Sequence, residues 1–288
     1  MIFNHQSVLL RETVAGLDLK TDGQYLDATV GGGGHSEQIL AQTSDSELWA
    51  IDRDDQALAA AQTRLQPWVS RVHFWRGNFA EFEPGAQRFD GIVADLGVNS
   101  TQLDQAERGF SFRPEAAGPL DMRMDRRQPL TAQGLVNQAD VTELANWIYR
   151  YGEERLSRRI ARRIVERRPF QDTATLASAI ASVFPPRQRY GRIHPATRTF
   201  QALRIVVNGE LEALEALLRL APQWLKPGGR LGIISFHSLE DRLVKHGFRD
   251  HPMLERLTKK PIVATHEEID TNPRARSAKL RFAQRLRD

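Results

Sequence analysis

Three aspartates stand at the ends of short apolar runs in the first third of the chain: Asp27, Asp52 and Asp95. Each run has the length and composition of a buried strand. Parallel strands bring their carboxyl ends to one edge of a sheet, and α/β folds bind their ligands beyond that edge. Phe79 follows a further strand-like run in the same way. This spacing predicts one ligand site that contains all four residues.

Four consecutive glycines, Gly31 to Gly34, separate the first of these runs from a helix-like segment at residues 37–41. Glycine permits positive φ and lets the backbone approach a ligand, and a helix that follows offers free N–H groups. Asp52 comes 18 residues after Gly34, where a carboxylate can accept both ribose hydroxyls of an adenosine cofactor. A plain strand–turn–helix with a flexible loop is the alternative interpretation.

The glycine spacing and Asp27 indicate which adenosine cofactor fits. A dinucleotide site has glycines spaced as G-x-G-x-x-G and directed at a pyrophosphate, whereas these glycines are contiguous. Asp27 would repel a pyrophosphate but suits the cationic amino-acid end of S-adenosylmethionine. The residues therefore favour S-adenosylmethionine over a nicotinamide dinucleotide.

Strand-like and helix-like segments alternate up to residue 96, which predicts a Rossmann-like, doubly wound parallel α/β sheet. Residues 97–135 then lose this periodicity, helical patterns follow, and a strand returns at residues 230–236. We expect a binding domain of residues 1–104 and 206–288, with an inserted helical substrate-recognition domain at residues 105–205. One long helix is expected at residues 196–220 and an edge strand at residues 278–286.

Basic residues gather in the middle and at the end of the chain, although the whole chain carries only +4. Residues 105–210 hold 18 arginines, no lysine and 11 acidic residues. Six of these arginines, at positions 158, 159, 162, 163, 167 and 168, fall on one predicted helix. Such a distribution indicates a bound polyanion. Ordinary solvated helices, with ion pairs to Glu153, Glu154 and Glu166, are the alternative.

Several classes of protein do not fit the sequence. The 288 residues contain no cysteine, so disulfides and cysteine-based zinc sites are excluded. The first residues lack the pattern of a signal peptide, and no apolar run approaches the 18 residues of a membrane span. No metal-ligand spacing is recognised, so no metal is assigned. We expect a cytoplasmic protein with no membrane contact, and a homodimer stays open.

The sequence resembles the bacterial S-adenosylmethionine-dependent 16S rRNA (cytosine-N4) methyltransferases of the RsmH/MraW family over nearly its whole length. Long motifs carry this resemblance, among them Asp27-x-Thr29-x-Gly31-x-Gly33-Gly34-His35-Ser36 and Ser235-Phe236-His237-Ser238-Leu239-Glu240-Asp241-Arg242. The other matching segments are residues 5–10, 50–54, 95–98, 102–104, 108–112, 118–125, 151–154, 194–202 and 272–277. Asn99 and Thr101 depart from the family, which usually has Ser and Pro there.

The resemblance implies a class I methyltransferase that methylates the N4 amine of a cytidine in the decoding region of 16S rRNA, within the small ribosomal subunit. It implies that seven residues contact the cofactor: Gly33, Gly34, His35, Asp52, Phe79, Asp95 and Gln102. Of these, His35 and Gln102 rest on the resemblance alone. Three further residues, Arg108, Arg198 and His237, lie in motif-rich sequence, and we expect them to contact RNA.

Two roles stay open for Asp95, which either accepts hydrogen bonds from the cytidine N4 as a catalytic residue or only holds the cofactor. His237, Glu240 and Asp241 follow the strand expected at residues 230–236, so they could shape the base pocket or accept the product proton. A helix cap is the alternative there, with Ser238 as N-cap and Asp241 three residues later. Other functions also stay open: a methyltransferase of DNA or protein amines, a non-catalytic RNA-binding assembly factor, and a nicotinamide oxidoreductase.

Overall fold

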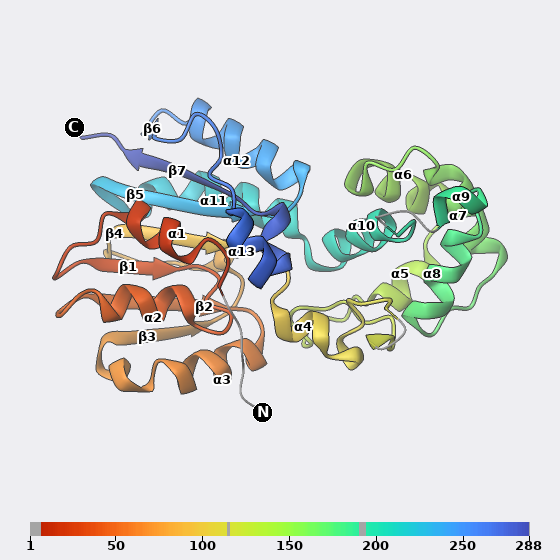
Figure 1. The fold of residues 1–288 in the computed structure, drawn as a ribbon, viewed down its shortest axis with the longest axis horizontal. Coiled ribbons are helices and arrows are strands. Elements are labelled where there is room, and N and C mark those ends of the chain that lie inside the picture. The colour runs from red at the N-terminus through yellow and green to blue at the C-terminus, as the bar shows by residue number, and fades with distance from the viewer. Residues whose placement is uncertain (1–6, 114–115, 190–193, 288) are drawn as a thin grey trace. The chain divides into compact units, whose positions relative to one another are not determined.

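The computed structural model describes residues 7–113, 116–189 and 194–287. The chain forms two compact units (Figure 1). The first unit comprises Met1–Gly97 and Leu211–Asp288, and the second comprises Val98–Glu210. Each unit is described by itself. The motif at residues 5–10 begins outside the described residues.

A seven-stranded sheet forms the first unit, in the order β3-β2-β1-β4-β5-β7-β6. Strands β1 to β5 run parallel wherever they pair, and β7 runs antiparallel to both of its neighbours, β5 and β6. This sheet confirms the predicted Rossmann-like, doubly wound architecture. The strands are β1 (Gln24–Asp27), β2 (Glu47–Asp52), β3 (Val72–Arg76), β4 (Phe89–Asp95), β5 (Leu225–Ser235), β6 (Leu254–Arg256) and β7 (Lys279–Arg285).

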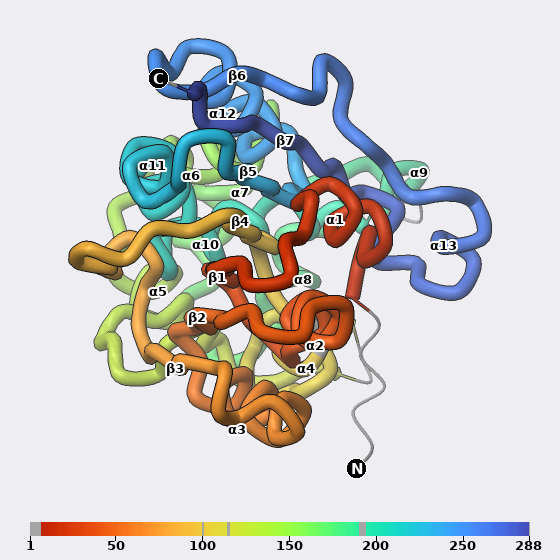
Figure 2. Tube along the Cα trace, turned by 90° about the vertical axis from the view of Figure 1, so that its left-hand side faces the viewer, coloured from red at the N-terminus to blue at the C-terminus, as the bar shows by residue number. Residues whose placement is uncertain are grey.

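Two hydrophobic layers cover the faces of this sheet because successive strand residues point to opposite sides. Tyr25 packs in the layer that contains residues of α1 (Leu10–Leu17), α2 (Gly34–Ala41) and α3 (Asp55–Arg64). Its neighbour Leu26 packs in the layer that contains residues of α11 (Glu210–Trp224) and α12 (Ser238–Asp250). Figure 2 looks down the axes of the strands, with α1 and α2 on one side of the row of strands and α11 on the other. Leu9, Val14 and Leu17, the core positions expected near the N-terminus, are all buried.

Short helices complete this unit. They are the α-helix α13 (His266–Thr271) and the 3₁₀ helices η1 (Gln66–Arg71), η2 (Phe79–Glu81) and η5 (Pro273–Ser277).

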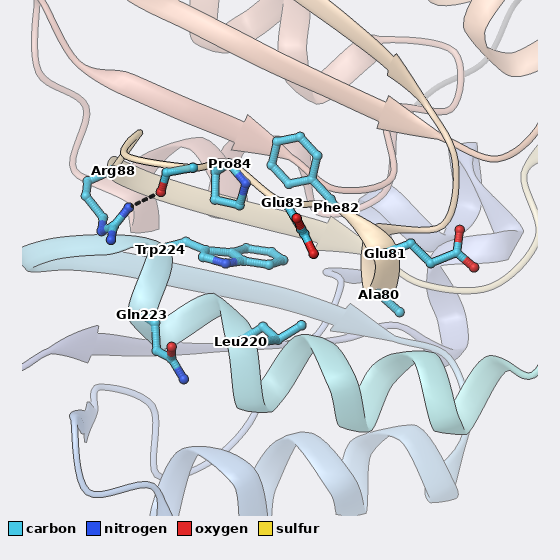
Figure 3. A pocket seen from close by; sticks show the side chains of 10 residues that line it. Ala80, Glu81, Phe82, Glu83, Pro84, Arg88, Leu220, Gln223 and Trp224 are labelled. Carbon is cyan, nitrogen blue, oxygen red and sulfur yellow. Dashed lines mark hydrogen bonds between the residues drawn. The ribbon is translucent and has the colours of Figure 1, made fainter.

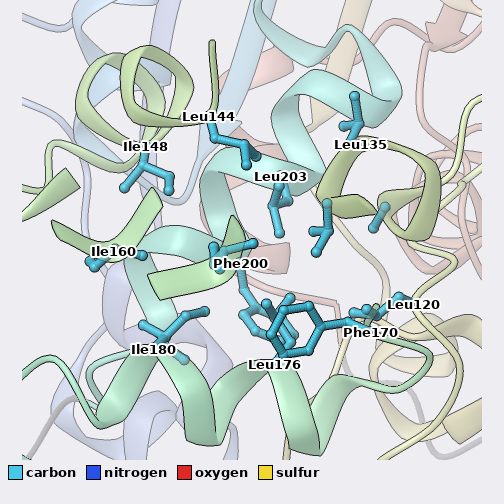
Figure 4. Packing of buried hydrophobic residues seen from close by; sticks show 14 of the residues in the cluster. Leu120, Leu135, Leu144, Ile148, Ile160, Phe170, Leu176, Ile180, Phe200 and Leu203 are labelled. Atoms are coloured by element: carbon cyan, nitrogen blue, oxygen red, sulfur yellow. The ribbon is translucent and has the colours of Figure 1, made fainter. Parts of the chain in front are cut away.

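The second unit is helical, and its core gathers residues that are far apart in its sequence. Figure 4 shows side chains from several helices, including Leu144, Ile160, Ile180 and Phe200, in this core. The helices are α4 (Ser100–Asp104), η3 (Ala106–Arg108), α5 (Ala132–Gln138), α6 (Val141–Gly152), α7 (Ser157–Glu166), α8 (Thr173–Ala181), α9 (Pro186–Arg189) and α10 (Thr197–Asn208). None of the helices in the described ranges is long and apolar enough to cross a membrane.

Two predicted elements were wrong. The single helix expected at residues 196–220 is two helices, α10 and α11, because Gly209 adopts φ +58 and ends α10. The strand expected at the edge of the sheet is β7, which lies inside it, because β6 pairs with its outer side. The three residues of β6 are too few to give a strand signal in the sequence.

An ion-pair cluster joins α12 to β7. Asp241 on α12 accepts hydrogen bonds from Arg281 Nε at 2.7 Å and from Lys279 Nζ at 3.2 Å. The Arg281 side chain is only 5% exposed. A buried guanidinium is costly without its partner, so this pair stabilises the contact between helix and sheet.

We expect Asp241→Asn to lower the free energy of unfolding by about 3 kcal/mol, because Arg281 keeps a buried charge without a counterion. Urea unfolding followed by circular dichroism measures this change. Asp250→Asn is the matched control on the same helix, since it removes an exposed pair with Arg249 and should leave the midpoint unchanged. Equal midpoints for all three proteins would contradict a structural role for Asp241.

Candidate functional site

Three parallel strands deliver their terminal aspartates to one edge of the sheet. Asp27 ends β1, and its backbone stands in register with Ala50 of β2 and Val93 of β4. Asp52 and Asp95 lie two residues further along β2 and β4. The register therefore brings the carboxylates to neighbouring positions at the switch point between β1 and β4, where the strand order reverses.

Hydrogen bonds tie the glycine loop to both neighbouring strands. Ala28 N donates to Val93 O of β4 at 2.8 Å, and Val30 N donates to Ile51 O of β2 at 2.7 Å. Gly31 N then donates to Asp52 Oδ2 at 2.9 Å. These hydrogen bonds hold the loop in one position at the ends of the strands. The loop therefore differs from the flexible loop of the alternative interpretation.

The glycines of this loop serve different purposes. Gly31 has φ +51, and a Cβ there would meet nothing closer than 3.8 Å, so its backbone stays open to a ligand. Gly33 caps α2 with φ +81, and a Cβ there would press on the Ala61 backbone. At Gly34 a Cβ would overlap the Ser7 hydroxyl. Packing therefore explains glycine at positions 33 and 34, while Gly31 fits the open cradle expected of a cofactor loop.

Two backbone amides donate hydrogen bonds to the Asp52 carboxylate. Oδ2 accepts from Gly31 N, and Oδ1 accepts from Asp54 N at 2.9 Å. Burial raises the pKa of Asp52 to about 6, although these two hydrogen bonds act in the opposite direction. Each carboxylate oxygen has a second lone pair, so Asp52 can still accept the two ribose hydroxyls.

Asp27 is the most enclosed of the three, at 2% exposure. Its Oδ2 accepts from Ser36 Oγ at 2.7 Å and its Oδ1 from Thr29 N at 3.2 Å. Burial raises its pKa to about 6, partly offset by those hydrogen bonds and reinforced by the charge of Asp52. Asp27 thus orders the loop and adds negative charge beneath it.

Asp95 differs from the other two because one of its carboxylate oxygens lacks a donor. Its backbone N donates to Thr29 Oγ1 at 2.6 Å, which fastens β4 to the glycine loop. The residue is half-buried, yet Oδ1 is buried and has no hydrogen-bond partner in the described part of the chain. Burial raises the pKa of Asp95 well above its usual value, and the charges of Asp27 and Glu240 raise it further.

An unsatisfied buried acceptor costs about 1–3 kcal/mol. The site therefore has a place for a hydrogen-bond donor or a cation at Asp95. Together with the open backbone at Gly31 and the spare lone pairs of Asp52, this set of groups fits S-adenosylmethionine, which carries ribose hydroxyls, an ammonium and a sulfonium.

The two other expected cofactor residues in the first unit are held by local structure. His35 is 6% exposed, and its Nε2 lies 3.0 Å from Val8 O, which requires the proton on Nε2. Phe79 is 8% exposed and packs in the hydrophobic layer that contains α11. Asn78 caps the short helix at Phe79 by accepting from Ala80 N. Only a small part of either side chain can contact a cofactor in this conformation.

Gln102 belongs to the second unit, where it is 3% exposed. It forms a capping box with Asn99: Gln102 N donates to Asn99 Oδ1 at 2.9 Å, and Asn99 N donates to Gln102 Oε1 at 3.0 Å. Asn99, a departure from the family pattern, thus supplies a good N-cap for α4.

The cap expected after β5 exists, but one residue earlier in the chain. His237 is the N-cap of α12 and Glu240 is its partner, whereas Ser238 and Asp241 were expected. Glu240 is 2% exposed and accepts from Phe236 N at 2.8 Å. Its charge contributes to the raised pKa of Asp95, so Glu240, one of the residues expected at this edge, acts on the site. The capping-box signal pointed to this segment without giving its register.

The two arginines expected to contact RNA differ in exposure. Arg108 is 1% exposed and donates to Arg123 O and Met124 O at 3.0 and 3.1 Å. Its burial does not support a phosphate contact and instead makes it a support of the surrounding loops. Arg198 has a 55% exposed side chain that lies 3.6 Å from Glu154 and donates to Glu153 O at 3.4 Å, so it is accessible to a ligand.

A pocket of about 300 Å³ lies elsewhere in the first unit (Figure 3). It is lined by residues 80–85, Arg88 and the end of α11. Inside it Phe82 and Trp224 stack edge to face at 5.7 Å. This pocket adjoins the start of β4, whereas Asp95 ends that strand, so it is not part of the candidate site.

The raised pKa of Asp95 predicts a dependence of stability on pH. The folded protein keeps this proton at pH values where the unfolded chain has lost it, so stability falls as pH rises above about 4. Asp95→Asn removes that loss. We expect its melting temperature to exceed that of the wild type increasingly as pH rises above about 4.5, by about 2–4 °C for each kcal/mol recovered.

Asp90, near the other end of β4, is the matched control. Burial would raise its pKa, but hydrogen bonds from Lys20 and Lys226 hold it below the usual value. Asp90→Asn should therefore lose stability relative to the wild type as pH rises through about 4. Scanning calorimetry measures the melting temperature of each variant relative to the wild type across this pH range. If the two differences change with pH in the same direction, the pKa of Asp95 is not raised in the folded protein.

Known proteins resemble the chain over nearly its whole length. The model of the MraW methylase family matches residues 2–286. "Ribosomal RNA small subunit methyltransferase H" of Synechococcus elongatus is 60% identical over 284 residues, which cover 99% of this chain and 95% of the relative. The protein of the same name from Picosynechococcus sp. is 58% identical over 282 residues, covering 98% of this chain and 97% of the relative.

Solved structures are more distant. TrmN from Thermus thermophilus has a TM-score of 0.48 at 12% identity, covering 96% of this chain and 48% of that one. SMU.1697c of Streptococcus mutans, a putative methyltransferase solved in complex with SAH, has a TM-score of 0.46 at 11% identity, covering 98% and 99%. These scores carry no argument about function. The family match and the identities near 60% show that the chain belongs to the MraW methylase family.

Proposed function

We propose that this protein transfers a methyl group from S-adenosylmethionine to the exocyclic N4 of a cytidine in the decoding region of 16S rRNA. The observation that carries the proposal is Asp95: a carboxylate at the end of β4 with a buried oxygen that lacks a donor, beside a loop and a second carboxylate suited to an adenosine cofactor. Family membership supports the same reaction.

Asp52 and the loop would hold the nucleoside part of the cofactor. The carboxylate accepts hydrogen bonds from the ribose hydroxyls, and it is itself oriented by Gly31 N and Asp54 N. The positive φ of Gly31 exposes the backbone on which the cofactor lies. When bound, S-adenosylmethionine supplies an electrophilic methyl group on a sulfonium.

Asp95 would act on the cytidine. The N4 lone pair is delocalised into the ring, so the amine reacts poorly unless its hydrogens meet acceptors that orient the lone pair. Asp95 Oδ1 offers such an acceptor. As N4 bonds to the methyl carbon, the bond of that carbon to the sulfonium would break and leave a neutral thioether. N4 gains positive charge in this step and returns to neutrality by releasing a proton. Asp95 accepts that proton when it is ionised, and its raised pKa makes the ionised carboxylate a stronger base.

The role of the second unit in this proposal is to hold RNA. It carries the exposed Arg198. Arg108 is not proposed as an RNA contact because its side chain is buried. His237, whose Nε2 lies 3.2 Å from Glu240 Oε1, lies in the first unit after β5 and would contact the cytidine base. The reaction would take place on the small ribosomal subunit in the cytoplasm.

The direct test incubates the protein with labelled S-adenosylmethionine and, in parallel, unmodified small subunits, naked 16S rRNA, DNA or a protein extract. Nucleoside digests are then searched for N4-methylcytidine by mass spectrometry. We expect label in N4-methylcytidine from the ribosomal substrates only. Label in DNA or protein, or cofactor binding with no transfer to any substrate, would overturn the proposed reaction.

Variants separate cofactor binding from catalysis. Asp52→Ala should weaken S-adenosylmethionine binding roughly 10- to 100-fold in calorimetry, because charge-assisted hydrogen bonds of about 1.5–3 kcal/mol are lost. Asp95→Asn should keep that affinity within a few-fold and lower kcat by roughly 100-fold or more. Unchanged turnover of Asp95→Asn would remove its catalytic role, and a matching loss of cofactor affinity would assign it to cofactor binding.

A further inference from the structure

Helix α7 of the second unit exposes an unusual density of arginines. Its buried side consists of Ser157, Ile160, Ala161 and Ile164, which pack into the unit. On a helix of 3.6 residues per turn, Arg158, Arg159, Arg162 and Arg163 then cover the opposite side. The first three are exposed and Arg163 is half-buried. We call these four residues the α7 arginine face.

Acidic residues neutralise little of this face. Among the described residues, Arg163 alone of the four has an ion pair, at 3.4 Å from Glu166, an exposed partner. Glu154, one of the counterions expected from the sequence, accepts instead from Leu156 N at 2.8 Å and lies 3.6 Å from Arg198. Of the expected ion pairs, Arg163 with Glu166 is formed, while Glu154 pairs with Arg198 outside this face.

Such a face works against stability. Arg158 and Arg162 are four residues apart, and so are positions 159 and 163, so each pair projects from the helix roughly 6 Å apart along its axis. Like charges at this spacing destabilise a helix. Within the helix, Arg162 Nε reaches only the Arg158 carbonyl, at 3.4 Å.

We propose that the α7 arginine face binds the phosphate backbone of the RNA substrate, a proposal that rests on the proposed function. The guanidinium groups donate in pairs to phosphate oxygens, which a lysine cannot do, and residues 105–210 contain arginine but no lysine. Phosphate contacts position an RNA without reading its sequence. The face would therefore contribute affinity and orientation, and no chemistry.

The composition of the face favours RNA over an acidic protein partner. Protein interfaces have an apolar centre with charged residues at the rim. The α7 arginine face is charged at its centre, and the single exposed apolar side chain of α7, Val165, lies beside that centre. A backbone of regularly spaced phosphates matches a surface of this kind.

The test compares two triple variants by filter binding to a 16S rRNA fragment across a salt series. Arg158→Gln/Arg159→Gln/Arg162→Gln removes the centre of the face and keeps the helix propensity of its positions high. Arg126→Gln/Arg187→Gln/Arg219→Gln is the control, since it removes the same charge from exposed arginines outside α7. Circular dichroism and S-adenosylmethionine affinity confirm that both variants fold.

We expect the α7 variant to bind about 10-fold more weakly at low salt and its slope of log Kd against log salt to fall by about 2, because roughly two to three phosphates lose their contacts. The KM for the ribosomal substrate should rise while kcat at saturation stays unchanged. The control variant should keep a slope close to that of the wild type. Restoring the charge with three lysines should recover the slope but only part of the affinity.

Each other outcome has a distinct meaning. If the wild type binds no RNA, the proposed function itself fails. If the wild type binds RNA and the α7 variant keeps its slope, or if the control loses as much, the α7 arginine face is not the phosphate site. If the α7 variant binds naked RNA normally but loses methylation of assembled subunits, the face docks a ribosomal protein and the RNA proposal is overturned.

Discussion

Carboxylates crowded at one edge of a parallel sheet are the constraint on which this structure depends. The register of β1, β2 and β4 leaves Asp27, Asp52 and Asp95 no alternative to being neighbours. Burial raises the pKa of each carboxyl group. The charge of Asp52 raises the pKa of Asp27 further, and the charge of Asp27 does the same to Asp95. The protein contains this cost by directing Ser36 and backbone amides at the first two carboxylates. Asp95 keeps an oxygen without a partner, which makes it the place where a ligand gains most.

Hydrophobic burial in the rest of the first unit offsets the unfavourable free energy of these buried carboxylates. Hydrophobic layers on both faces of the sheet bury side chains that alternate along each strand, as Tyr25 and Leu26 do. This burial is the main source of folding free energy. The strand ends therefore stay well ordered although their carboxylates oppose folding. The bond from the Asp95 backbone to Thr29 carries the same order into the glycine loop, so the groups proposed to meet the cofactor are positioned before it binds.

The second unit shows a different use of charge. Arg108 and Arg198 have the same side chain, but one is buried under carbonyl groups and the other is exposed. The exposed arginines of α7 have few counterions, which is unfavourable for an isolated helix and useful for holding a polyanion. In our proposals the strand-end carboxylates of the first unit perform the chemistry, and cationic side chains of the second unit hold the RNA.

The sequence by itself determined the alternation of strands and helices, the aspartates at the strand ends and the family, because these depend on local pattern and on long motifs. It could not determine which arginines are exposed, since burial depends on residues far away in the chain, as the contact of Arg108 with the Met124 carbonyl shows. Likewise, β7 lies inside the sheet only because β6 joins its far side. The His237 cap and the break at Gly209 were settled by backbone conformation within the folded units. The unpartnered oxygen of Asp95 is also a tertiary property, because only packing decides which donors reach a buried acceptor.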